Sequence, residues 1–141
     1  MRIVLDTNIL LTSFSDRSAT HWIVDALKNK RFELAYTTQI LAEYEEKFSE
    51  HWNAFMAETV ITTILELPNT IPTTVYYSLN LLTNDPDDNK FADCAFASNA
   101  TFLVSNDNDF TVLKSIDFPV IRVVTLQEFE QILFEKNSSD Q

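Results

Sequence analysis

The chain alternates short apolar runs with longer stretches in which apolar residues recur at helical spacing. Two runs, at 3–5 and 102–104, stop abruptly at polar residues, and two further strand candidates lie at 32–36 and 120–124. Runs that are apolar on both faces are typical of buried parallel strands. The stretches between the strands predict helices at 19–29, 38–50, 54–66, 74–83 and 125–135.

A further helix is expected to begin at Asp85-Pro86. Asp85 suits the position before a helix, and a proline suits the first helical position. Asn99 can end this helix in the left-handed conformation, where a glycine is usual, because the chain contains no glycine. The resulting alternation of strands and helices predicts an α/β fold with an open, mostly parallel sheet, helices on both faces and right-handed crossovers.

The length of 141 residues, with 45% hydrophobic residues, indicates one globular domain. We assign this domain to residues 1–135 and expect 136–141 to be a flexible C-terminal tail. No apolar run approaches the length of a membrane span and no secretory signal is visible. The single cysteine, Cys94, lies in an apolar stretch and predicts a buried reduced thiol, so we expect a soluble cytoplasmic protein.

The net charge of −11 repels phosphate backbones. If the protein binds nucleic acid, it must therefore do so through a local device rather than through a basic surface.

Two aspartates follow the short apolar runs directly or closely. Ligands of an open parallel sheet bind beyond the carboxyl ends of the strands, near the point where the strand order reverses, and Asp6 and Asp107 are expected there. Either residue alone could simply cap the next helix. Both together favour a functional site.

Asp93 and Glu43 are two further candidates. Asp93 interrupts a segment that is otherwise aromatic, Ala or Cys, where a carboxylate is costly unless it is paired or bound to a metal. It could also lie on a narrow polar stripe with Asn89. Glu43 borders the apolar stripe of its predicted helix and could instead pair with Lys47 on the surface.

If these four acids converge, their mutual repulsion requires protons or a divalent cation. Two unit charges about 4 Å apart repel by about 4 kcal/mol at an effective dielectric constant near 20. Oxygen ligands with open positions favour Mg²⁺ or Mn²⁺. Such a site suits metal-assisted hydrolysis of a phosphodiester, and the cation would make an acidic pocket attractive to phosphate.

Four ordered blocks of the sequence carry these acids. They are Arg2-Ile-Val-Leu-Asp-Thr-Asn-Ile-Leu-Leu11, Leu41-Ala-Glu43-Tyr-Glu, Asp85-Pro-Asp-Asp-Asn-Lys-Phe-Ala-Asp93-Cys-Ala and Leu103-Val-Ser-Asn-Asp107-Asn-Asp109-Phe. The blocks resemble the acidic motifs of PIN-domain nucleases, which include the VapC-type toxins of bacterial toxin–antitoxin pairs. The third block is similar to a branch described as toxin components of the PIN family, and the resemblance covers about residues 1–130.

The resemblance implies an α/β/α sandwich, a Mg²⁺- or Mn²⁺-dependent endoribonuclease that acts on RNA, often a homodimer, and an antitoxin partner. By position it assigns the metal-binding acids to Asp6, Glu43, Asp93 and Asp107, with Asp88 or Asp109 as contributors and Asn8 and Ser105 orienting the carboxylates. In the third block, Asp88, Asn89 and Asp93 remain alternatives for the residue that faces the metal.

The sequence bears on two other functions. A PIN-fold module that binds protein without catalysis is the main alternative. A covalent phosphoaspartate is disfavoured, because Asn8 stands where phosphatases of the haloacid-dehalogenase type need a second acid.

Overall fold

The computed structural model describes residues 1–15 and 17–139 and contains a five-stranded parallel sheet in the order β3-β2-β1-β4-β5. The strands are β1 (Arg2–Leu5), β2 (Glu33–Tyr36), β3 (Thr70–Pro72), β4 (Phe102–Val104) and β5 (Val123–Val124). The helices are α1 (Thr7–Ser13), α2 (Trp22–Lys28), α3 (Thr38–His51), α4 (Ala54–Glu66), α5 (Asn89–Ala97) and α6 (Leu126–Ser139). Two 3₁₀ segments span Pro86–Asp88 and Asn108–Ser115.

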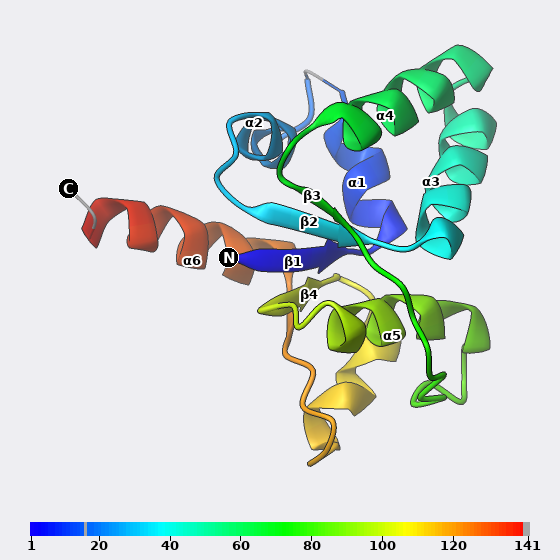
Figure 1. Ribbon diagram of the computed structural model, residues 1–141. Helices are drawn as coiled ribbons and strands as arrows, with labels where there is room; N and C mark the ends of the chain where they lie inside the picture. The colour runs from blue at the N-terminus through cyan, green and yellow to red at the C-terminus, as the bar shows by residue number, and fades with distance from the viewer. Residues whose placement is uncertain (16, 140–141) are drawn as a thin grey trace.

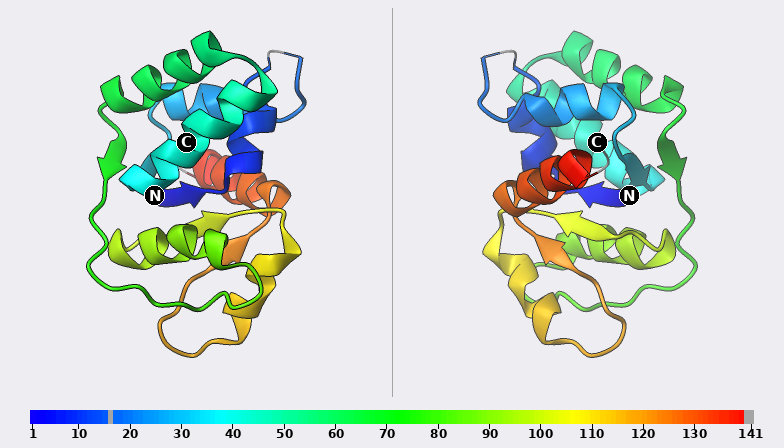
Figure 2. Two further views of the ribbon diagram at one scale, coloured as in Figure 1. Left: turned by 90° about the vertical axis from the view of Figure 1, so that its right-hand side faces the viewer. Right: turned by 90° about the vertical axis from the view of Figure 1, so that its left-hand side faces the viewer.

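The sheet is the middle of three layers, which confirms the predicted α/β/α fold. Helices α1 to α4 lie on one side of the sheet and α5 on the other (Figure 1), and the side views show the same separation (Figure 2). The central strands are apolar on both faces because both faces are covered: Val4, Leu34 and Leu103 are fully buried.

The strand order reverses between β1 and β4. The chain runs outward from β1 to β2 and β3, and then crosses the sheet to place β4 on the other side of β1. The register pairs Leu5 with Val104, so that the residues following these two strands lie side by side. This edge is the expected position for a ligand site in an open parallel sheet.

The helix predicted at 74–83 is wrong. The structure has a loop of bends and irregular backbone from 73 to 84, in which Asn80 adopts a positive φ of 52°. Backbone groups of Leu79 and Leu82 in this loop bond to side chains of α5. The apolar residues that suggested a helix include Leu82, which is buried in the core.

Smaller differences concern short elements. Strand β3 and helix α1 were not predicted, and β5 occupies only two residues of the run 120–124. Helix α6 extends beyond its predicted end at 135 to Ser139, and residues 140–141 of the expected tail lie outside the described residues. No helix in the described part of the chain is long and apolar enough to cross a membrane.

Asn99 ends α5 with a φ of 56°, which confirms the left-handed helix end predicted from the sequence. Cys94 is a free and fully buried thiol, also as predicted. Burial raises the pKa of this thiol to about 12.

Candidate metal centre

Asp6 lies directly after β1 and is held by a backbone group at the end of β4 and by a side chain that follows it. Its N–H donates to the Val104 carbonyl oxygen at 3.1 Å, and the Ser105 hydroxyl donates to Asp6 Oδ2 at 2.8 Å. The Asp107 N–H in turn donates to Ser105 Oγ at 3.0 Å. Ser105 therefore fixes the orientation of the buried Asp6 carboxylate.

Asp107 and Glu43 act electrostatically on Asp6. Burial raises the pKa of Asp6, the Ser105 hydrogen bond opposes this rise, and the charges of Asp107 and Glu43 add to it. Asp107 itself is exposed, and its Oδ1 accepts the Asp109 N–H at 2.9 Å, which begins the second 3₁₀ segment. The structure thus brings together three of the predicted acids at the carboxyl edge of the sheet.

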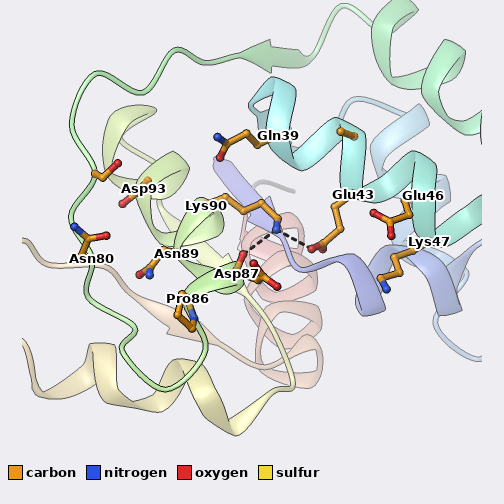
Figure 3. Close-up of a pocket in the computed structure, with 12 residues that line it drawn as sticks. Gln39, Glu43, Glu46, Lys47, Asn80, Pro86, Asp87, Asn89, Lys90 and Asp93 are labelled. Atoms are coloured by element: carbon orange, nitrogen blue, oxygen red, sulfur yellow. Dashed lines mark hydrogen bonds and ion pairs between the residues drawn. The ribbon is translucent and has the colours of Figure 1, made fainter.

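Helix α3 carries Glu43, and Tyr44 holds this helix against the end of β1. The fully buried Tyr44 hydroxyl donates to the Leu5 carbonyl oxygen at 2.6 Å. The carboxylate of Glu43 accepts a hydrogen bond from the Thr7 hydroxyl and pairs with Lys90, whose Nζ lies 2.8 Å from Glu43 Oε1. Figure 3 shows the Lys90 side chain reaching from α5 toward Glu43.

Asp88 is the member of the third block that faces the other acids. Burial, followed by the charges of Asp85 and Asp6, raises the pKa of Asp88 to about 7, and Asp107 contributes in the same direction. Asp88 Oδ2 is buried and has no hydrogen-bond partner among the described residues. One oxygen each of Asp85, Asp88 and Asp109 lie within 4.8 Å of one another.

A divalent cation fits this arrangement. Carboxylates that repel one another, together with a buried oxygen that lacks a partner, are costly in the absence of positive charge. Lys90 supplies one positive charge and contacts Glu43. The donors are all oxygen atoms, which suits Mg²⁺ or Mn²⁺.

Asp93 and Asn89 face away from this cluster. Asp93 Oδ1 accepts the Leu79 N–H at 3.0 Å, while Asn89 accepts the Leu82 N–H at 2.8 Å and donates to the Leu82 carbonyl oxygen at 3.0 Å. The two side chains lie one helical turn apart on α5 and attach the loop 73–84 to it. The structure therefore does not bring Asp93 together with Asp6, Glu43, Asp88 and Asp107, and the cost of burying its carboxylate is offset by the Leu79 hydrogen bond.

The remaining candidates lie at the margin of the site. Asn8 is exposed in the first turn of α1, where its backbone carbonyl accepts a hydrogen bond from Thr12 Oγ1. Asp109 is exposed and belongs to the group formed with Asp85 and Asp88.

The site contains residues that sequence reasoning did not single out, namely Thr7, Tyr44, Asp85 and Lys90. Thr7 is adjacent to Asp6, and Lys90 stands inside the third block, so both were close to a recognised signal. Tyr44 follows Glu43 directly, but the sequence does not show which carbonyl its hydroxyl reaches.

An open cleft of about 660 Å³ adjoins Glu43 and Lys90. Its lining includes Gln39, Ser78 and Asn80, and Asp93 lies on the far side of Lys90 from Glu43 (Figure 3). Most of the lining is polar, and it is formed by α3, the loop 73–84 and the start of α5.

Comparisons with known proteins agree with this picture. A family model described as PIN domain matches residues 2–109. The solved structure of VapBC2 from Rickettsia felis, bound to a DNA fragment from its promoter, has a chain that matches with a TM-score of 0.62 and 22% identity, over 89% of this chain and 98% of that one. For VapBC-1 from nontypeable Haemophilus influenzae the TM-score is 0.57 at 16% identity, over 90% and 99% of the two chains.

A third solved structure, the PIN domain of T. brucei RRP44, matches with a TM-score of 0.51 at 13% identity, over 97% of this chain and 83% of that one. At these identities the likeness concerns the fold. No curated protein sequence matches the chain.

Proposed function

The chain belongs to the PIN domain family, and on that premise we propose that it is a metal-dependent endoribonuclease and the toxin component of a toxin–antitoxin pair. The observation that carries the proposal is the convergence of carboxylates at the reversal point of the sheet, with the unpartnered Asp88 Oδ2 among them. A divalent cation would compensate the repulsion among these carboxylates and supply the partner that Asp88 Oδ2 lacks.

We assign metal binding to Asp6, Glu43, Asp88 and Asp107, with Mg²⁺ or Mn²⁺ as the ion. Such an ion would supply the Lewis-acid chemistry for hydrolysis of a phosphodiester. Asp85 and Asp109 lie close enough to Asp88 to contribute an oxygen each.

The surrounding residues position these acids. The hydroxyls of Ser105 and Thr7 hold the carboxylates of Asp6 and Glu43 in one orientation, which lowers the cost of ordering them when the ion binds. We assign Asp93 to positioning the loop 73–84 rather than to the metal. Asn8 retains its proposed role of orienting a carboxylate, from the exposed first turn of α1.

We also propose an antitoxin partner, a homodimer and a cytoplasmic location. The VapBC structures support an antitoxin partner, since their matching chains share the fold of this chain.

Exposed aromatic side chains on the α3–α4 hairpin, Trp52 and Phe55, offer apolar surface for association with a partner or a second copy of the chain. The buried reduced thiol of Cys94 suits the cytoplasm. Light scattering after size-exclusion chromatography measures the oligomeric state.

Cleavage of an RNA that contains both structured and single-stranded regions tests the activity. The purified protein is assayed with Mg²⁺, with Mn²⁺ and with chelator, beside Asp6→Asn and the matched exposed control Asp117→Asn. We expect cleavage that requires the metal, survives in the control and falls by more than about 100-fold in Asp6→Asn, since removing a ligand exceeds the effect of a residue that only orients one. Circular dichroism verifies that each variant is folded.

Full activity of Asp6→Asn would contradict the assignment. Calorimetric binding of a divalent cation without cleavage of any RNA would instead support the non-catalytic binding module. The Lys90–Glu43 ion pair is the observation that favours this second function, because it already neutralises one of the four acids.

A further inference from the structure

The loop 73–84 exposes two adjacent aromatic side chains. Tyr76 is 83% exposed and Tyr77 is 82% exposed. Large aromatic side chains are usually buried or half-buried, and they gain most when their rings contact another surface. Two neighbouring exposed rings offer a surface on which a flat ligand group can stack.

The backbone that carries these tyrosines is fixed on both sides. Before them, the Thr73 N–H donates to the Tyr36 carbonyl oxygen at 2.8 Å, which continues the pairing of β3 with β2. After them, the loop is attached to α5 by Asp93 at Leu79 and by Asn89 at Leu82. Fixing the backbone in advance reduces the entropy that a bound ligand would have to overcome.

The residues on either side of the tyrosines line cavities next to Glu43 and Lys90. Val75, which precedes them, and Ser78, which follows them, both line a cavity of about 280 Å³ together with Lys90 and Asp93. Ser78 and Lys90 also line the larger cleft next to Glu43. The loop that carries the tyrosines therefore borders the same cleft as Lys90, whose ammonium can contact a phosphate.

The charge of the protein favours stacking as the mode of binding. A chain with a net charge of −11 gains little from the general attraction between basic surfaces and phosphates. Stacking of bases on aromatic rings supplies affinity without positive charge. Only unpaired bases can stack in this way, because the bases of a duplex are already stacked on one another.

Resting on the proposed function, we propose that Tyr76 and Tyr77 form a stacking platform for unpaired bases of single-stranded RNA and so direct cleavage to single-stranded segments. Asn89 and Asp93 position this platform through the loop. The substrate class is RNA with unstacked bases near the scissile phosphate.

Fluorescence anisotropy tests the platform with a labelled 12-nucleotide single-stranded RNA of mixed sequence. Ca²⁺ replaces Mg²⁺, and a gel verifies that the RNA stays intact. The double variant Tyr76→Ala/Tyr77→Ala is expected to weaken binding by roughly 5- to 150-fold for each base that stacks. Tyr76→Phe/Tyr77→Phe keeps the rings and is expected to bind within about threefold of wild type.

Phe118→Ala is the matched control, since Phe118 is equally aromatic and 82% exposed but lies outside the loop 73–84. It is expected to leave RNA binding unchanged. Duplex RNA of the same sequence is expected to bind more weakly than the single strand and to be insensitive to the tyrosine substitutions. Equal binding by wild type and the Ala variant, equal losses in the Phe and Ala variants, or no binding by wild type would each overturn the platform.

Cleavage by the wild-type protein with Mg²⁺ is measured in parallel, so that the two proposals can fail separately. Metal-dependent cleavage with tyrosine-independent binding overturns the platform and leaves the nuclease. Tyrosine-dependent binding without cleavage overturns the nuclease and leaves a site for single-stranded RNA.

Discussion

Replacing Asp88 with asparagine measures the cost of negative charge in the metal-free centre. Burial and the charges of Asp85 and Asp6 raise the pKa of Asp88 from 3.8 to about 7 in the folded protein. The folded state therefore prefers the protonated carboxyl. The stability that this group contributes is fully present below pH 4 and is lost as the pH rises to about 7.

The pKa shift sets the size of the effect. Each pKa unit corresponds to about 1.4 kcal/mol, so a shift of about three units gives ~4 kcal/mol as an upper limit at pH 8. Asparagine keeps the shape of the side chain without its charge. Because Asp88 is only partly buried, solvent screening reduces this limit, and in chelator at pH 8 we expect Asp88→Asn to raise the free energy of unfolding by ~1–3 kcal/mol, and at pH 5.5 by about half as much.

Urea denaturation at the two pH values, both above the sequence pI of 4.4, measures these differences. Asp117→Asn, an exposed substitution outside the site, is the matched control and should change stability by less than about 0.5 kcal/mol. Adding Mg²⁺ should stabilise wild type more than the variant, because an ion that binds the folded state stabilises it and Asp88→Asn removes one of the proposed ligands. A destabilised Asp88→Asn, or a gain that does not depend on pH, would refute the electrostatic argument.

Three further substitutions test the parts around the acids. Tyr44→Phe leaves the buried Leu5 carbonyl oxygen without its hydrogen bond and should lower the free energy of unfolding, measured by urea denaturation, by ~1–3 kcal/mol. An unchanged urea midpoint would contradict a stabilising role for this bond. Asp93→Ala removes one attachment of the loop 73–84 and should speed hydrogen exchange of the loop amides, while metal binding measured by calorimetry persists. Loss of metal binding in this variant would indicate that Asp93 is a metal ligand. Lys90→Met removes the positive charge 2.8 Å from Glu43 and should tighten Mg²⁺ binding in calorimetry, whereas weaker binding would show that the ammonium organises the site.

The elements that could be predicted from the sequence are those whose burial leaves a continuous pattern. The central strands β1 and β4 are covered on both faces and appear as uninterrupted apolar runs. Strand β3 lies at the edge of the sheet and reads Thr-Ile-Pro, which carries no such pattern. The loop 73–84 contains apolar residues at helical spacing, but its conformation depends on partners in α5 that lie elsewhere in the sequence.

The same distinction applies to the site. Asp6 and Asp107 could be placed together because parallel strands bring their carboxyl ends to one edge of the sheet. Asp88 and Asp93 could not be distinguished, because the choice depends on the 3₁₀ turn before α5, which rotates Asp88 toward the acids and leaves Asp93 to the loop. The Lys90–Glu43 pair joins two helices that are far apart in the sequence, and no local pattern predicts it.

The start of α5 links the two proposed sites, the metal centre and the stacking platform, through one helix. Asp88 faces the carboxylates, while the next residue, Asn89, hydrogen-bonds to the loop that carries the tyrosines. An ion that fixes Asp88 would therefore also restrain the start of the helix to which the loop is attached. By thermodynamic reciprocity, any factor by which the ion raises the affinity for a strand at the platform is also the factor by which the strand raises the affinity for the ion. Helix α5 is the element through which such coupling between the two proposed sites would pass.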